Sequence, residues 1–350
     1  MSEKLSSLTL VPTAEEKYSG KDFKSDQEVR WCPGCGDYAI LAAVQSFLPE
    51  LGVKRENIVF VSGIGCSSRF PYYLNTYGLH SIHGRAPAIA SGLSVSRPDL
   101  SVWVVTGDGD ALSIGGNHLL HALRRNVNLK ILLFNNRIYG LTKGQYSPTS
   151  EMGKITKSTP AGSLDHPYNP VSLAIGAEAS FVARTIDSDR KHLTEVLRQA
   201  AAHEGTALVE IYQNCNIFND GAWEPLKDSD TSEDLVIRLV HGEPITFGAN
   251  KDRGVIRDEN GSLKVASAEE AGTKGFVIHD AHNPDASYAF ALSRLSHPEN
   301  LNDTPIGVFR DIKRPVYDQL VQQQIADVTA KKGAGDLAKL IQGNDSWTVS

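Results

Sequence analysis

In the segment RWCPGCGDYAI, Cys32 and Cys35 stand three positions apart, and their spacing raises the question of what these two thiols bind. The chain has two more cysteines, Cys66 and Cys215. Four thiolates make one complete ligand set, and both a structural zinc ion and a 4Fe-4S cluster take such a set. The spacing leaves zinc and iron-sulfur open, and a buried, unreactive Cys215 is a further alternative.

The cellular compartment bears on the use of these thiols. The N-terminal segment MSEKLSSLTLVPTAEEKYSGKDFK is polar and lacks the apolar centre of a signal peptide, so we expect a cytoplasmic protein with reduced thiols. Reduced thiols favour metal or redox work over disulfides. The apolar runs fall far short of the roughly 18 residues of a membrane span, and a net charge of −6 comes with no basic stripe. We therefore expect neither membrane nor nucleic acid as a partner.

A second set of chemistry-bearing residues lies in the segment that begins GDGDALSIGG and ends NNRIYG. Gly107 and Gly109 allow the backbone to turn closely around a bound diphosphate, while Asp108 offers a carboxylate to a hard divalent cation. Asn136 brings an amide oxygen to the same point, and the carbonyl of Ile138 can supply a third oxygen. The segment therefore predicts a magnesium-diphosphate anchor; the alternative is a tight turn with Asp108 as a helix cap.

Strands and helices that alternate along the chain must position these residues. The patterns predict strands at 57–61, 101–106, 129–134, 180–185 and 206–212, and helices at 37–48, 86–97, 112–125, 169–179 and 188–205. Asp37 is the expected N-terminal cap of the first of these helices. The alternation predicts an α/β fold in which helices cover both faces of a parallel sheet.

The chemistry-bearing residues come where predicted strands end. Cys66, Asp108, Asn136 and Cys215 each follow one of these strands closely, and Asn135 precedes Asn136 at the same point. Loops that leave neighbouring parallel strands converge at the carboxyl edge of the sheet, where helix N-termini also point. We therefore expect the cysteines and the magnesium ligands to share one edge.

Two further regions are less regular. Residues 140–169 are rich in Gly, Ser, Thr, Pro and Lys and are expected to form a functional loop over the sheet edge. Beyond about residue 220 we expect short strands joined by turns over 245–267, a helix over 314–331 and a short helical tail. The apolar face of that helix carries Val316, Leu320, Val321 and Ile325.

Several motifs in the sequence resemble those of a known protein family. GDG followed about thirty residues later by NN, across one strand-helix-strand unit, resembles the thiamine diphosphate (ThDP) binding motif. Together with CPGCG, GIGCSSRF, HGRA, NCNIFND and HDAHNPDASYAFALSRL, it resembles the beta subunit of the 2-oxoacid:ferredoxin oxidoreductases, most closely the 2-oxoglutarate branch. The similarity extends over nearly the whole chain.

The resemblance implies a set of cofactors and the residues that hold them. Cys32, Cys35, Cys66 and Cys215 would ligate one 4Fe-4S cluster, and Asp108, Asn136 and Ile138 would ligate Mg²⁺. The segment Ile64 to Ser67 would contact both the cluster and ThDP. The implied ThDP-binding residues are Ile64, Gly65, Cys66, Ser67, His83, Gly107, Asp108, Gly109, Asp110, Asn136, Gly140 and Leu141.

The implied reaction is the coenzyme A-dependent oxidative decarboxylation of 2-oxoglutarate to succinyl-CoA and CO₂, with electrons passed to ferredoxin. Because the substrate is a dianion, Arg69 and Lys143 are the expected substrate-binding cations, and His83 is expected to make a polar contact near the reaction centre. His83 as an ordinary turn histidine, and Arg69 and Lys143 as solvated surface residues, are the alternatives. His118 and His121 are read as packing or surface residues.

The chain has room for a diphosphate domain alone, whereas a complete ThDP enzyme also needs a pyrimidine domain with an activating glutamate. We therefore expect an alpha subunit to carry that domain, in an α2β2 heterotetramer. Within this chain the expected organisation is an arm at 1–25, a ThDP-binding domain with the cluster at 26–220, and a partner-contacting extension at 221–350. The alternative functions are the same chemistry on pyruvate or another 2-oxoacid, and a zinc-stabilised, non-catalytic subunit.

Overall fold

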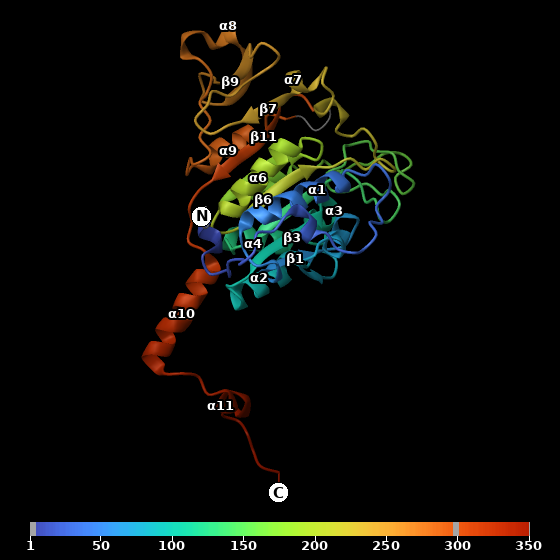
Figure 1. The fold of residues 1–350 in the computed structure, drawn as a ribbon. Helices are drawn as coiled ribbons and strands as arrows, with labels where there is room; N and C mark the ends of the chain where they lie inside the picture. The colour runs from blue at the N-terminus through green and yellow to red at the C-terminus, as the bar shows by residue number, and fades with distance from the viewer. Residues whose placement is uncertain (1–4, 297–300, 350) are drawn as a thin grey trace.

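An eight-stranded sheet forms the centre of the chain in a computed structural model, which describes residues 5–296 and 301–349 (Figure 1). The strand order is β2-β1-β3-β4-β6-β5-β11-β7, and all neighbours are parallel except the pair β11 and β5. The strands are β1 (Ile58–Ser62), β2 (Tyr77–His80), β3 (Ser101–Gly107), β4 (Lys130–Asn135), β5 (Phe181–Ile186), β6 (Ala207–Tyr212), β7 (Val236–Leu239) and β11 (Thr304–Asp311).

Alternate side chains of the central strands enter two separate cores, because successive residues of a strand point to opposite faces of the sheet. Phe60 and Trp103 enter one core, where their rings stack with centroids 5.9 Å apart. Val61 and Val104 enter the core on the other face. Since β1 and β3 to β6 are buried along nearly their whole length, both faces must be covered by other elements.

Helices cover both faces. The helices α1 (Asp37–Phe47) and α6 (Arg190–Ala202) pack on one face, and α2 (Ala86–Ser96), α4 (Gly116–Arg125), α5 (Pro170–Gly176) and α9 (Ala286–Ser293) pack on the other. Three further helices are short: α3 (Asp108–Leu112), α7 (Ser232–Leu235) and α8 (Ala268–Ala271). The predicted α/β fold with helices on both faces is confirmed, and the five predicted strands lie within one residue of their expected bounds.

Two local predictions about helices were wrong. The first helix has Gly36 as its N-cap, and the Asp37 side chain makes no capping hydrogen bond but lies buried beneath the helix. The helix expected over 112–125 begins only at Gly116, because Ser113, which has φ −91° and ψ −104°, ends a separate short helix, α3, that was not predicted. Asp108 is the first residue of α3 and follows β3 directly.

The segment after residue 220 returns to the main sheet. Both β7 and β11 extend it beyond β5, so the same sheet contains strands from before and after residue 220. A small antiparallel sheet of β8 (Thr246–Phe247), β9 (Arg253–Arg257) and β10 (Leu263–Ser267) agrees with the short strands expected over 245–267. Figure 1 shows this small sheet and α8 at one end of the molecule, beyond α9 and β11.

The C-terminal segment forms the expected helices, α10 (Tyr317–Lys332) and α11 (Leu337–Gln342). Both project away from the sheet (Figure 1). Of the expected apolar face, Val316 is buried, whereas Leu320 and Ile325 are each 55% exposed. No helix among the described residues combines the length and the apolarity needed to cross a membrane.

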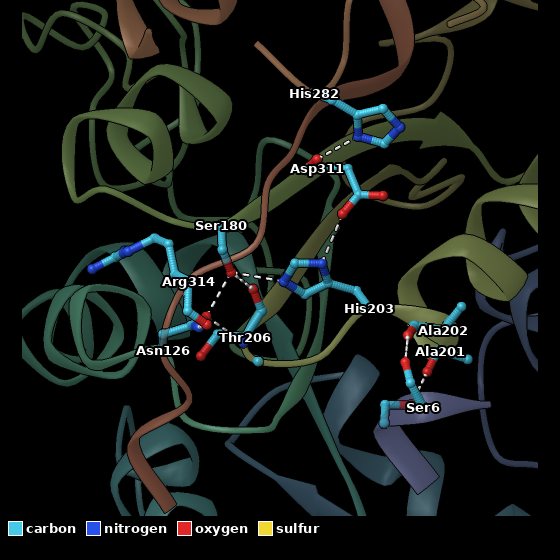
Figure 2. Close-up of polar contacts among 12 residues, drawn as sticks. Ser6, Asn126, Ser180, Ala201, Ala202, His203, Thr206, His282, Asp311 and Arg314 are labelled. Carbon is cyan, nitrogen blue, oxygen red and sulfur yellow. Dashed lines mark hydrogen bonds and ion pairs between the residues drawn. The ribbon is translucent and has the colours of Figure 1, made fainter. Parts of the chain in front are cut away.

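A polar network fastens the ends of the chain to the sheet (Figure 2). His203 lies between Ser180 and Asp311, with Nε2 2.7 Å from the Ser180 hydroxyl and Nδ1 2.8 Å from the Asp311 carboxylate. Asn126 accepts a hydrogen bond from Ser180 and donates to the carbonyl of Arg314, just before α10. Because Ser180 is fully buried, this serine-histidine-aspartate line is structural and ties β5, α6 and β11 together.

Candidate functional site

One hollow at the carboxyl ends of β1, β3 and β4 brings the predicted cofactor residues together. All twelve predicted ThDP-binding residues line it, as does Ile138. The sequence reasoning missed three further lining residues, Phe134, Tyr139 and Thr142. The three strands are consecutive neighbours in the sheet, so the loops that leave them meet at one point.

Asp108 begins α3 at the centre of this hollow and is only 2% exposed. Its Oδ2 accepts hydrogen bonds of 2.5 Å from the hydroxyls of Ser147 and Thr149. Burial raises the pKa of Asp108 to about 6, although both hydroxyl bonds favour the ionised form. A buried carboxylate with so little solvent is suited to a cation, which offsets the cost of burying its charge.

The two neighbouring asparagines at the end of β4 have different surroundings. Asn136 lines the hollow, and its Oδ1 accepts a 3.1 Å hydrogen bond from the backbone amide of Ile138. Asn135 lies outside the hollow, where it donates to Glu210. The loop therefore presents Asn136 and Ile138 to the same space as Asp108, as the sequence predicts.

Gly109 is required by a ring contact in this structure. A Cβ on Gly109 would lie 2.2 Å from Cε1 of Tyr139, whose hydroxyl donates a 2.9 Å hydrogen bond to the Gly109 carbonyl. A Cβ on Gly107 would meet nothing closer than the Ser67 hydroxyl at 3.5 Å. The absence of a side chain therefore lets Tyr139 close one wall of the hollow, a role that the sequence alone did not suggest.

His83 reaches the hollow from the loop before α2. Its Nδ1 lies 2.5 Å from Oδ1 of Asp110, and the same carboxylate oxygen accepts from the Gly84 amide. The second oxygen of Asp110 accepts a 2.8 Å hydrogen bond from Thr106. With its carboxylate occupied in this way, Asp110 orients the His83 loop, while the His83 side chain stays 43% exposed.

The four cysteines gather beside the same hollow. A Cβ on Gly140 would lie 3.5 Å from the sulfurs of both Cys66 and Cys215, and Cys66 also lines the hollow. Cys35 is close enough to Cys66 and Cys215 for charge on one thiol to raise the pKa of another. Cys32 is the exposed member of the group and interacts with Cys66 in the same way.

The surroundings of these sulfurs favour neutral thiols when no cation is near. Burial raises the pKa of Cys35, and it raises the pKa of Cys66 to about 12. The Gln213 amide donates to the Cys35 sulfur at 3.3 Å, and burial raises the pKa of Cys215 against backbone hydrogen bonds that lower it. Thiolate ligands need a compensating positive charge in such a place, and a metal supplies it.

Asp37 lies buried next to the cysteines, where a hydrogen bond from Cys35 lowers the pKa of its carboxyl and burial raises it more strongly. Burial raises the pKa of its carboxyl to about 7, with a further increase from nearby Asp187. Asp187 itself is paired with Lys227 at 2.7 Å and accepts a hydrogen bond from the Asn214 amide, next to Cys215. Asp187 therefore fixes the backbone next to Cys215, while Asp37 is the buried carboxyl next to Cys35.

The expected substrate cations lie around the rim. Arg69 follows the Cys66 loop and is close enough to lower the pKa of that thiol, and its buried Nε has no hydrogen-bond acceptor among the described residues. Lys143 is exposed in the loop that follows the magnesium ligands and has a positive φ of 76°. Neither residue lines the hollow itself.

The residue types present are those that Mg²⁺ and an iron-sulfur cluster use as ligands. Asp108, Asn136 and the Ile138 carbonyl are the oxygen ligands that Mg²⁺ prefers. Within the described ranges, no group of three or more Cys, His, Asp or Glu side chains lies close enough together to hold a single metal ion. A 4Fe-4S cluster has irons and sulfides between its thiolates and so accepts sulfurs that are gathered but not in mutual contact.

Known proteins share this fold and site region. Residues 63–211 match the C-terminal TPP binding domain of the thiamine pyrophosphate enzymes. The 2-oxoglutarate oxidoreductase subunit KorB of Mycobacterium tuberculosis is 64% identical over 341 residues, which are 97% of this chain and 91% of that protein. The 2-oxoacid:ferredoxin oxidoreductase subunit beta of a Sulfolobus species is 48% identical over 192 residues, which are 54% of this chain and 63% of that protein.

A solved structure extends the likeness to three dimensions. It is the 2-oxoglutarate:ferredoxin oxidoreductase from Magnetococcus marinus with 2-oxoglutarate, coenzyme A and succinyl-CoA bound. The TM-score is 0.73 at 34% sequence identity, and the match covers 95% of this chain and 98% of that chain.

Proposed function

The chain belongs to the beta subunits of the 2-oxoacid:ferredoxin oxidoreductases, within the 2-oxoglutarate branch, and we propose that it holds ThDP, Mg²⁺ and one 4Fe-4S cluster. With an alpha subunit, it converts 2-oxoglutarate and coenzyme A to succinyl-CoA and CO₂. The C1–C2 bond of the oxoacid breaks, a thioester bond forms, and two electrons and one proton are released. The electrons pass one at a time to ferredoxin.

The observation that carries this proposal is the shared edge of the sheet. Asp108 and Asn136 line the same hollow as Cys66, and the sulfur of Cys66 lies beside Gly140 on the loop that leaves β4. A diphosphate anchor and a set of thiols in this arrangement support electron transfer over a short distance. A cofactor that releases electrons needs such a nearby acceptor.

Each set of residues has a proposed task. Asp108, Asn136 and the Ile138 carbonyl hold Mg²⁺ and, through it, the diphosphate. When bound, ThDP supplies the carbon that adds to the 2-oxo group and accommodates the electrons left by decarboxylation. Tyr139 closes the hollow against water, and Gly140 and Leu141 pass beside the thiazolium.

The substrate contacts are proposed for the cations of the rim. Arg69 offers a fork of donors that suits a carboxylate, and its unpaired, buried Nε supports that use. Lys143 is exposed next to the hollow and offers a point charge for the second carboxylate. His83, oriented by Asp110, holds or moves a proton near the 2-oxo group.

A separate alpha subunit completes the catalyst. The described part of this chain contains one α/β sheet, and no second strand-helix series follows β6 to form a pyrimidine domain. We propose that the alpha subunit supplies that domain and its activating glutamate, in an α2β2 assembly. The segment 221–350 of this chain, with its projecting helices, is proposed to contact that subunit.

The cofactors can be tested by analysis of the complex purified without oxygen. The expected result is four irons, four labile sulfides, one ThDP and one Mg²⁺ per beta chain. In Asp108→Ala, ThDP and Mg²⁺ are lost while iron stays complete; in Cys215→Ser, iron is lost. Asp99→Ala, which changes an exposed carboxylate paired with Arg97, is the matched control and keeps every cofactor. Zinc in place of iron, or ThDP retained by Asp108→Ala, contradicts the proposal.

The substrate is tested by assaying the same complex with several 2-oxoacids and a viologen dye as electron acceptor. We expect the highest kcat/KM with 2-oxoglutarate, and a larger loss in Arg69→Met for this dianion than for pyruvate. Equal rates with pyruvate would move the assignment to a broader 2-oxoacid specificity, which the Sulfolobus relative's name describes for that protein.

A further inference from the structure

A second hollow of about 310 Å³ lies at the carboxyl ends of β4, β5 and β6. It shares no lining residue with the hollow that contains Asp108. Asn135, Arg137, Thr149, Arg184 and Trp223 are among its lining residues. Thr149 donates a hydrogen bond to Asp108, which lines the first hollow, so the walls of the two hollows are in contact at this pair.

Arg137 is the unusual residue of this second hollow. The residue is only 8% exposed, and its guanidinium lies 4.0 Å from the centroid of the Trp223 ring. No hydrogen bond or ion pair joins the guanidinium to any described residue, and the carboxylates of Glu151 and Glu210 act on it only through their charge. Since Glu151 is paired with Lys154 and Glu210 with Arg184, a ligand that supplies negative charge to the buried guanidinium would be favoured.

The arrangement around Arg137 keeps the guanidinium in place. Trp223 stacks on Tyr212 with ring centroids 3.6 Å apart and an interplanar angle of 9°. The indole N–H donates a 3.0 Å hydrogen bond to the Asn135 carbonyl, and the backbone of Arg137 has a left-handed φ of 56°. Arg137 is therefore presented on a rigid aromatic platform rather than on a mobile surface.

The charge of the hollow is positive. Glu210 is the one carboxylate among its described lining residues, and its Oε2 is paired with Nε of Arg184 at 2.7 Å. Its Oε1 accepts from Asn135, so both carboxylate oxygens are satisfied within the wall. Arg137 and, at the exposed mouth, Arg294 remain as charges that Glu210 does not neutralise.

We propose that this second hollow is a binding site for a small dianion, either a phosphate or a dicarboxylate, anchored by Arg137. A planar guanidinium binds both classes through paired N–H donors. A volume of about 310 Å³ accommodates a small molecule of this kind. Since the two hollows share no lining residue, its ligand can be measured in the complex both with and without added ThDP.

Equilibrium dialysis of the purified complex with labelled inorganic phosphate and, separately, with labelled malonate tests the site at constant ionic strength. We expect saturable binding of one anion per beta chain for at least one of the two probes, and the preferred probe identifies the class. In Arg137→Met, the affinity should fall at least tenfold. Arg97→Met, which removes an exposed arginine paired with Asp99, is the matched control and should bind as the unchanged chain does.

The outcomes decide the proposal in each case. Binding that is absent at millimolar anion, or that is equally strong in Arg137→Met, overturns it. If Arg137→Met does not assemble, Arg294→Gln decides: a several-fold loss of affinity at the exposed mouth supports the site, and unchanged affinity overturns it. Binding lost equally in Arg97→Met shows a general charge effect and also overturns it.

Discussion

Replacing Gly109 with alanine tests how the wall of the ThDP hollow is built. The new Cβ would stand 2.2 Å from Cε1, 2.6 Å from Cζ and 2.8 Å from Cδ1 of Tyr139, all closer than such atoms can approach. The ring must therefore move, and its 2.9 Å hydrogen bond to the Gly109 carbonyl is lost or weakened. Overpacking costs about 1–3 kcal/mol and a lost hydrogen bond about 1 kcal/mol, so we expect about 2–4 kcal/mol less stability.

Urea unfolding of the chain measures the loss of stability. Calorimetric titration of the complex with ThDP measures whether ThDP affinity falls as well. Gly116→Ala is the matched control, because a Cβ on Gly116, the first residue of α4, meets nothing within 4 Å. That variant should keep both stability and ThDP affinity. Gly109→Ala should lose stability and, because Tyr139 lines the hollow, also ThDP affinity.

A double-mutant cycle identifies the cause. If the ring is responsible, Gly109→Ala should be nearly harmless when Tyr139 is already alanine, so the two free-energy changes should be far from additive. The reasoning fails if the free energy of unfolding of Gly109→Ala lies within about 0.5 kcal/mol of that of the unchanged chain, which is the usual range of a neutral substitution. Strict additivity in the cycle would likewise show that the ring contact is not the source of the cost.

Three further predictions concern other described contacts. Burial lowers the pKa of His192 to about 4, so the unfolded chain takes up a proton on this residue first as pH falls below about 6.5; in urea unfolding, the change in stability from pH 7.5 to pH 5 should be about 2 kcal/mol less favourable for the unchanged chain than for His192→Gln, and equal changes in both would contradict this. Thr149→Val removes a 2.5 Å hydrogen bond to Asp108 and should lower stability by about 1–3 kcal/mol in the same assay, with no change contradicting the observed contact. Asp110→Asn weakens the orientation of His83 and should lower kcat about tenfold or more at saturating ThDP while the iron content, measured chemically, stays complete; unchanged kcat would remove the positioning role.

The fold and the place of the first hollow follow from local sequence patterns, whereas most of the residues that line the hollow were expected from the family resemblance. Buried strands separated by amphipathic helices predict a parallel sheet, and residues that follow strands then share one edge. Cys66, Asp108 and Asn136 were placed correctly at that edge for this reason alone. Their positions depend only on where strands end, which short-range periodicity reveals.

Contacts made by irregular segments could not be predicted in the same way. Ser147 and Thr149 reach Asp108 from a loop 39 and 41 residues away, which has no periodicity to indicate its path. The stacking of Arg137 on Trp223 likewise joins two segments that no local pattern connects. Asp37 was mistaken for a helix cap because its residue type suits that role, whereas tertiary packing buries its carboxylate beneath the cysteines.

The order of strands explains why the proposed magnesium and iron sites would be neighbours. The sheet runs β1-β3-β4-β6, so the loops that carry Asp108 and Asn136 lie between the loops that carry Cys66 and Cys215. Strands β3 and β4 therefore present the oxygen ligands at the centre, and the flanking strands present two of the thiols. Both thiols come close to Gly140 on the loop that leaves β4, since a Cβ there would lie 3.5 Å from each sulfur. That distance is an ordinary contact, so the approach of the two sites follows from the strand order, which brings the two flanking loops together over the loop of β4.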